Sequence, residues 1–118
     1  MAVSILIVDD DPNILDTATD ILEDAGYNVS AAGTGATALE QLRATPADVA
    51  LLDFNLPDAT GVELAVQFKK IRPHLQILLM TGEEHVDLGP AQEAIHSVLT
   101  KPVSPVKLIN VIRQIVEP

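Results

Sequence analysis

The sequence predicts an α/β fold, namely a doubly wound parallel sheet of five strands with five helices on its two faces. Short apolar runs rich in Val, Ile and Leu alternate along the chain with longer segments in which apolar residues recur at helical spacing. The runs are almost entirely apolar, which is typical of parallel strands buried on both faces. Right-handed crossovers between successive strands then place helices on both sides of the sheet.

The elements are expected to follow one another as strand and helix, five times. Strands are expected at residues 4–8, 28–32, 48–52, 75–80 and 97–100. Helices are expected at about 12–25, 35–44, 61–72, within 83–96, and from about 104 to 116. The second strand is the least apolar and is a candidate for the sheet edge.

Several helix boundaries carry local signals. Asp11 followed by Pro12 is a strong helix start, because Asp caps free backbone N–H groups and Pro suits the first turn. Gly26 is a plausible stop for this helix. Between residues 83 and 96, Gly89-Pro90 should break or delay a helix, so that helix is expected to be short or irregular.

The composition restricts the class of protein. With 118 residues, 47% of them hydrophobic and 3% aromatic, residues 1–118 should form a single domain with an aliphatic core. A formal charge of −10 disfavours direct contact with nucleic acid or an anionic membrane. The absence of cysteine excludes disulfides and thiol catalysis. Neither a membrane span nor a signal peptide is evident, so we expect a cytoplasmic location.

Polar residues with related chemistry follow four of the expected strands. They are Asp9, Asp10 and Asp11 after the first strand, Asp53 after the third, Thr81 after the fourth and Lys101 after the fifth. The ligand site of an open α/β sheet lies outside the carboxyl ends of its strands, so these side chains should meet at one edge. Such a set can bind a divalent cation and accept a phosphoryl group.

Taken singly, the same residues have simpler explanations. Asp10 and Asp11 could only cap the following helix, and Asp11 is expected to do mainly that. Asp53 alone could be a turn residue, and Lys101 alone could be a solvated surface side chain. The functional interpretation depends on all of them falling at carboxyl ends of strands.

Five segments together resemble the receiver domain of bacterial two-component response regulators. They are residues 5–12 (ILIVDDDP), 51–58 (LLDFNLPD), Gly61 with Glu63 and Leu64, 79–82 (LMTG) and 100–102 (TKP). The resemblance covers essentially the whole chain. It implies a flavodoxin-like sheet with the strand order 2-1-3-4-5.

The resemblance also implies a phosphorylation-controlled switch. Asp53 would be the phosphoacceptor, and its donor would be a phosphohistidine on a sensor histidine kinase or a phosphotransfer protein. Lys101 would pair with Asp53 before phosphorylation and with a phosphoryl oxygen afterwards, while Thr81 would donate its hydroxyl to another oxygen. Such a domain changes only its own phosphorylation, so we do not expect an enzyme.

The cofactor implied by the family is Mg²⁺. Its ligands would be the carboxylates of Asp9, Asp10 and Asp53 and the backbone carbonyl of Asn55, with water completing the octahedron. The family usually has a cis peptide bond between the lysine and the following proline, so a cis Lys101-Pro102 bond is expected.

Other positions modulate this scheme. In the family, an aromatic side chain three residues before the lysine rotates inward after phosphorylation, but here that position is Val98, which cannot serve this role. The residues that flank the path of attacking water would be Asn55 and Glu83, both polar, and Gly82 leaves the approach open. We therefore expect relatively fast autodephosphorylation.

Two further questions remain open at this level. The apolar residues of the last helix cover a wide arc, which predicts either burial on two sides or contact with a second copy or an effector domain. The chain could also be an interaction module with the same fold that no longer uses phosphorylation. A phosphohydrolase with an Asp nucleophile is disfavoured, because such enzymes usually place that residue after the first strand.

Overall fold

The computed structural model describes residues 2–83 and 85–117. Its elements follow in the order β1 (Ser4–Val8), α1 (Pro12–Asp24), β2 (Asn28–Ala32), α2 (Gly35–Ala44), β3 (Val49–Asp53), α3 (Gly61–Ile71), β4 (Gln76–Thr81), η1 (Gly89–Ala91), β5 (Ser97–Thr100) and α4 (Pro105–Val116). The five strands form one parallel sheet in the order β2-β1-β3-β4-β5, which confirms the expected topology.

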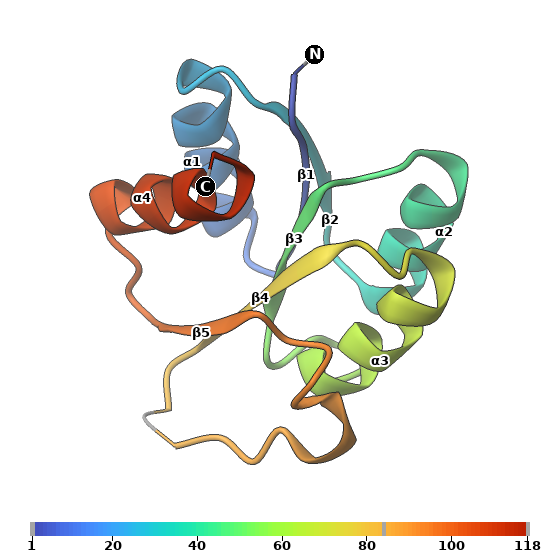
Figure 1. The fold of residues 1–118 in the computed structure, drawn as a ribbon. Helices are drawn as coiled ribbons and strands as arrows, with labels where there is room; N and C mark the ends of the chain where they lie inside the picture. Colours follow the sequence, from blue (N-terminus) through green and yellow to red (C-terminus); the bar gives the residue numbers. More distant parts are fainter. Residues whose placement is uncertain (1, 84, 118) are drawn as a thin grey trace.

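Two helices cover each face of the sheet. Figure 1 shows α1 and α4 on one side and α2 and α3 on the other. Successive residues of a strand point to opposite faces, so Ile5 and Ile7 pack under α1 and α4 while Leu6 and Val8 pack under α2 and α3. Because both faces are covered, the strands need no polar side, which explains their continuous apolar runs.

The helices begin where side-chain oxygens cap them. Asp11 accepts a hydrogen bond from the backbone N–H of Asn13 at 2.9 Å and thereby caps α1. Thr34, Thr60 and Ser104 cap α2, α3 and α4 in the same way. None of the helices within residues 2–83 and 85–117 is both long and apolar enough to cross a bilayer.

The prediction of five helices is wrong for the part of the chain that the structure describes. The described residues contain four α-helices, and between β4 and β5 their only helical element is the 3₁₀ turn η1. Gly89 has φ of 51°, and Pro90 lacks a backbone N–H, so a regular helix cannot form there. Ala91 and Ile95 still fill the core beside α3, because both are buried.

The expected strand boundaries differ from the observed ones by one residue at β3 and β4. Each begins and ends one position later than predicted, so Asp53 and Thr81 are the last residues of their strands. Asp53 pairs with Met80, and Thr81 pairs with Thr100. A polar side chain does not prevent the backbone from continuing the ladder, which the apolar pattern alone could not indicate.

Candidate functional site

Asp9 follows β1 and is fully buried, with 0% of its surface exposed. Its backbone N–H donates to the carbonyl of Ala32 at 3.1 Å, which extends the pairing of β1 with β2. Its Oδ1 accepts the backbone N–H of Asp11 at 2.9 Å. The carboxylate is therefore held rigidly at the carboxyl edge of the sheet, with Oδ2 directed toward Lys101.

Asp53 ends the central strand β3 and is 7% exposed. The chain packs closely behind it, and a Cβ atom on Gly61 would lie only 2.5 Å from the backbone oxygen of Asp53. Glycine at this position therefore allows α3 to start directly against the end of β3. The backbone of Asp53 is fixed by this packing, while its carboxylate lies at the sheet edge.

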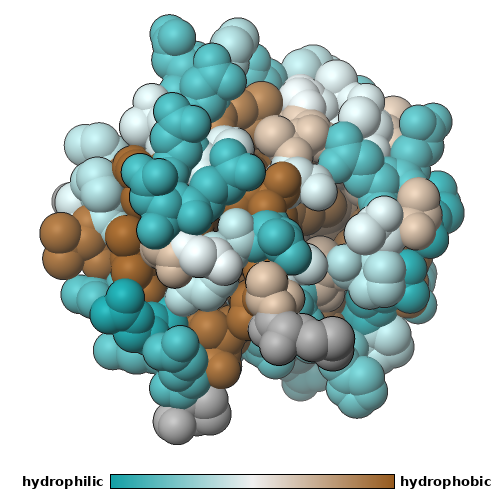
Figure 2. Space-filling view, turned by 90° about the horizontal axis from the view of Figure 1, so that it is seen from above, coloured by the Kyte–Doolittle hydropathy of each residue, from teal (hydrophilic) through white to brown (hydrophobic). Residues whose placement is uncertain are grey.

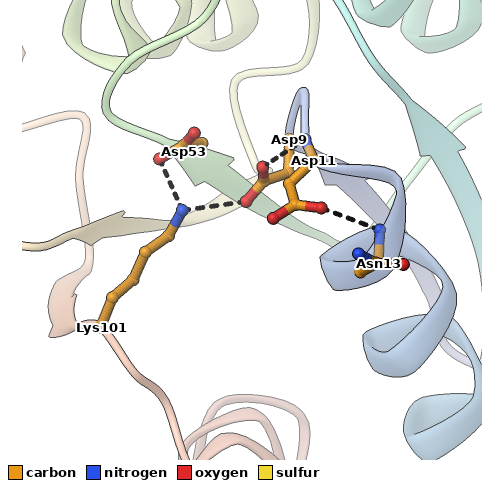
Figure 3. A network of polar contacts seen from close by, with 5 residues as sticks. All are labelled: Asp9, Asp11, Asn13, Asp53 and Lys101. Carbon is orange, nitrogen blue, oxygen red and sulfur yellow. Dashed lines mark hydrogen bonds and ion pairs between the residues drawn. The ribbon is translucent and has the colours of Figure 1, made fainter.

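Lys101 joins the two buried carboxylates. Its backbone N–H donates to the carbonyl of Thr81 at 2.7 Å, which fixes the residue after β5 beside the end of β4. Figure 3 shows its side chain reaching from there between Asp9 and Asp53. The Nζ atom lies 3.0 Å from Asp9 Oδ2 and 3.0 Å from Asp53 Oδ1. The Lys101-Pro102 peptide bond is cis, as predicted.

The charges of this cluster do not balance. Burial raises the pKa of Asp53, and the negative charge of Asp9 raises it further, while Lys101 and the backbone of Asn55 act in the opposite direction. The pKa of Lys101 is raised: burial lowers it, but bonding to Asp53 and Asp9 outweighs that loss. A single ammonium group thus faces two buried carboxylates.

A third carboxylate completes an acidic group. Oxygen atoms of Asp9, Asp10 and Asp53 all lie within 4.8 Å of one another. Asp10 is exposed, so the group opens to solvent. Hard oxygen ligands with excess negative charge, open to water, fit the requirements of Mg²⁺, which retains several water ligands in proteins. The residues present are therefore suitable for this ion.

Thr81 comes to the same edge from β4. It is 2% exposed and lies one residue beyond Met80, the partner of Asp53 in the sheet. Its Oγ1 accepts the backbone N–H of Glu83 at 3.1 Å. A hydroxyl that accepts this bond still has its own hydrogen to donate, so Thr81 can donate a hydrogen bond to an anionic oxygen near Asp53.

The remaining predicted positions surround this group. Asn55 lies in the loop after β3, where it forms an isolated bridge with Thr60. Gly82 and Glu83 are exposed just after β4. Val98 of β5 is 39% exposed, and the described part of the segment before β5 contains only the 3₁₀ turn η1. The roles assigned to these residues stay predictions.

Two contacts of the site are not predictable from the sequence. The sequence indicates only a metal ligand at Asp9, but its carboxylate also accepts a hydrogen bond from Lys101, 92 residues away in the chain. Asp58, in the loop after β3, accepts hydrogen bonds from the start of α2. The sequence Leu-Pro-Asp that ends at Asp58 predicts a loop. Nothing in the local sequence indicates which distant backbone groups the Asp58 carboxylate contacts.

Comparison with known proteins decides the family. The model of the response regulator receiver domain matches residues 5–113. This chain belongs to that family. Among its relatives is the response regulator receiver protein CpdR of Brucella abortus, which is 36% identical over 112 residues and 93% covered. That alignment covers 93% of this chain. Against three transcriptional regulatory proteins, by contrast, the aligned part is only 27%, 36% and 23% of the relative's length.

Solved receiver domains have the same architecture. A CheY-like receiver domain protein from Methanospirillum hungatei superimposes with a TM-score of 0.91 at 34% identity, covering 97% of this chain and 93% of that one. The response regulator TrrA of Thermotoga maritima, solved in complex with Mg²⁺-BeF, gives a TM-score of 0.88 at 26% identity, with coverages of 97% and 99%. The similarity to both solved structures covers nearly the whole of this chain.

Proposed function

We propose that Asp53 of this receiver domain accepts a phosphoryl group from a phosphohistidine on a sensor histidine kinase or phosphotransfer protein. The observation that carries the proposal is the position of its carboxylate, which is buried, bonded to Lys101 and grouped with Asp9 and Asp10. Phosphorylation would then switch the interactions of the domain. We also infer that the domain works in the cytoplasm, where such kinases present their phosphohistidine.

The chain's own groups support the transfer in defined ways. A carboxylate oxygen of Asp53 attacks phosphorus in line, the P–N bond to the donor histidine breaks, and an acyl phosphate forms. The leaving imidazole takes a proton from solvent. Lys101 already touches Asp53 Oδ1 and can turn to a phosphoryl oxygen without leaving the site. Thr81 donates its free hydroxyl hydrogen to another oxygen.

Mg²⁺ is the proposed cofactor. Asp9, Asp10, Asp53 and the backbone carbonyl of Asn55 would hold it. When bound, the ion supplies positive charge that offsets the repulsion between carboxylates and the incoming phosphoryl group. Two acid side chains beside a carboxylate nucleophile would otherwise disfavour the approach of an anion.

A small phosphodonor tests the proposal directly. Purified protein would be incubated with acetyl phosphate, with Mg²⁺ or with chelator, and the mass of the intact protein would be measured. We expect one phosphoryl group only with Mg²⁺, and none on Asp53→Asn. Asp24→Asn, which changes an exposed acid of α1, is the matched control and should label like the parent. Labelling of Asp53→Asn would remove Asp53 from this role, and no labelling at all would favour the phosphorylation-independent module.

The lifetime of the acyl phosphate follows from the same site. Glu83 is exposed and Gly82 has no side chain, so water can reach the phosphoryl group. We propose autodephosphorylation without a separate phosphatase and no turnover of other phosphoesters. Decay would be followed after removal of the donor. A half-life of many hours with Mg²⁺ present would contradict the proposed role of these positions.

The output surface is proposed to include α4. Most of its apolar residues pack against the sheet, but Val106 in its first turn is 70% exposed. Viewed from above Figure 1, hydrophobic residues reach the surface mainly on the side of α1 and α4 (Figure 2). We propose that a second copy or an effector domain binds there. Unchanged self-association and partner binding in Ile109→Glu and Val116→Glu would remove this idea.

A further inference from the structure

The loop that follows Asp53 is closed by its own backbone hydrogen bonds. The N–H of Gly61 donates to the carbonyl of Phe54 at 2.8 Å, and the N–H of Leu56 donates to the carbonyl of Ala59 at 3.1 Å. Asn55 and Thr60 form an antiparallel bridge between these two bonds. Residues 54–60 therefore form a small hairpin with little internal freedom, and Asp58 lies at its tip.

Asp58 ties this hairpin to a helix distant in sequence. Its Oδ1 accepts the backbone N–H of Gly35 at 2.8 Å, and its Oδ2 accepts that of Ala36 at 3.0 Å. These are the first two N–H groups of α2, which its own cap Thr34 does not reach, since Thr34 accepts from Thr37. Both bonds lower the pKa of Asp58, as expected for a carboxylate at the positive end of a helix.

The other end of α2 is bonded to the same part of the chain. Arg72, which follows α3, donates from Nε and Nη2 to the carbonyl of Leu42 at 3.2 Å and 3.0 Å, and from Nη2 to the carbonyl of Arg43 at 3.3 Å. Charged side chains on either side of α3 thus bind both ends of α2. Helix α2 has little freedom to move independently of the loop and helix that follow Asp53.

We propose that Asp58 is a positioning residue of the phosphoacceptor site, which holds the Asn55 hairpin in place by bonding to α2 and makes the first turn of α2 respond to the state of Asp53. The inference rests on the proposed function, since it adds a structural support to the phosphoacceptor site. It also gives a path by which the state of Asp53 reaches helix α2. This route does not need an aromatic side chain at the position of Val98. Coupling of this kind is reciprocal, so loosening the Asp58 contact must also weaken binding at the site.

Hydrogen exchange at the first turn of α2 tests whether the state of the phosphoacceptor site affects this helix. Exchange of the Gly35 and Ala36 amides would be compared without ligand and with Mg²⁺ and beryllofluoride. In the parent we expect their protection to change when the site is loaded. In Asp58→Ala these amides should exchange fast in both states, so the response disappears. Thr34→Ala, which removes the cap that does not touch the hairpin, is the matched control and should keep the response.

Magnesium affinity tests whether the contact of Asp58 with α2 affects binding at the phosphoacceptor site. This measurement does not require phosphorylation. Titration calorimetry with MgCl₂ should give an affinity about five-fold weaker for Asp58→Ala, the lower end of ordinary coupling, and unchanged for Thr34→Ala. Asp58→Asn keeps one acceptor oxygen and should recover part of the loss. Urea unfolding of each variant would establish that the variants are folded, and circular dichroism would compare their helix content.

The outcomes separate this inference from the proposed function. Acetyl phosphate labelling of Asp53 together with unchanged magnesium affinity and unchanged α2 exchange in Asp58→Ala would overturn the inference alone. A protein that binds no Mg²⁺ would overturn both. Equal losses of affinity in Asp58→Ala and Thr34→Ala would also overturn the inference, because they would indicate a general loss of α2 stability instead of a contact with the hairpin.

Discussion

Replacing Lys101 with Met tests the electrostatics of the site, because Met has a similar length but no charge. The variant leaves the carboxylates of Asp9 and Asp53, which are 0% and 7% exposed, without the ammonium that lies 3.0 Å from each. Removing one partner of a buried ion pair usually costs about 3–5 kcal/mol. We expect a smaller loss of about 2 kcal/mol, because the Lys101 side chain is 26% exposed and water screens its charge. That corresponds to a fall in Tm of about 8 °C for a domain of this size.

The loss should depend on pH. Burial raises the pKa of Asp53 above 3.8, and Lys101 opposes this rise. Without Lys101 the folded-state pKa of Asp53 rises further, so the folded variant binds a proton more readily than the unfolded chain. Stability of the variant therefore falls as the pH rises from the unfolded pKa through the folded one, and the destabilisation is smallest in acid.

Urea unfolding followed by circular dichroism, between about pH 4 and pH 8, measures this effect. Lys70→Met, which removes an exposed lysine from α3, is the matched control and should change stability little. Adding Asp53→Asn to Lys101→Met removes one of the carboxylates left without an ammonium partner and should recover part of the lost stability. If Lys101→Met is as stable as Lys70→Met near neutral pH, the ion pairs do not stabilise the site as described.

Three further predictions follow from single residues. Gly61→Ala should lower the free energy of unfolding in urea by about 1–3 kcal/mol, because the added Cβ would overlap the backbone oxygen of Asp53. Gly82→Ala is the control, since a Cβ at that position meets nothing within 4 Å. Equal stabilities of the two variants would contradict the packing described for Gly61. The hydrogen bonds to Asp58 lower its pKa in the folded state below 3.8, the value of the unfolded chain. The stabilisation that the Asp58 carboxylate provides is therefore fully present above pH 3.8 and is lost as the pH falls through its folded-state pKa. The stability gap between the parent and Asp58→Ala should therefore close in acid, and a constant gap would refute this. Asp10→Asn should weaken Mg²⁺ binding in calorimetry with little loss of stability, since Asp10 is exposed; an unchanged affinity would remove it from the metal site.

Much of the site could be predicted because its chemistry is local in sequence and its assembly is a property of parallel sheets. Apolar runs locate the strands, and each run stops at a polar residue such as Asp9 or Asp53. Parallel strands end at one edge, so residues far apart in the chain meet without any knowledge of their contacts. Lys101 could be included for the same reason, and its contact with Asp53 confirms the expected pairing.

The contacts that could not be predicted depend on three-dimensional details. Lys101 bonds to Asp9 as well as Asp53 because β1 and β3 are neighbours, which fixes the separation of the two carboxylates. Asp58 reaches α2 only through the shape of its hairpin, and spacing in sequence contains no information on that shape. Gly89-Pro90 predicted an irregular segment, but not that a 3₁₀ turn would bring Ala91 into the core.

The structure of the domain with Mg²⁺ and beryllofluoride is the most direct test of the site. We predict the beryllium bound to a carboxylate oxygen of Asp53, the metal bound by Asp9 and Asp10, and the Nζ atom of Lys101 on a fluoride instead of on Asp9. Beryllofluoride bound to a different residue, or a metal remote from these carboxylates, would contradict the assignment of Asp53 as phosphoacceptor.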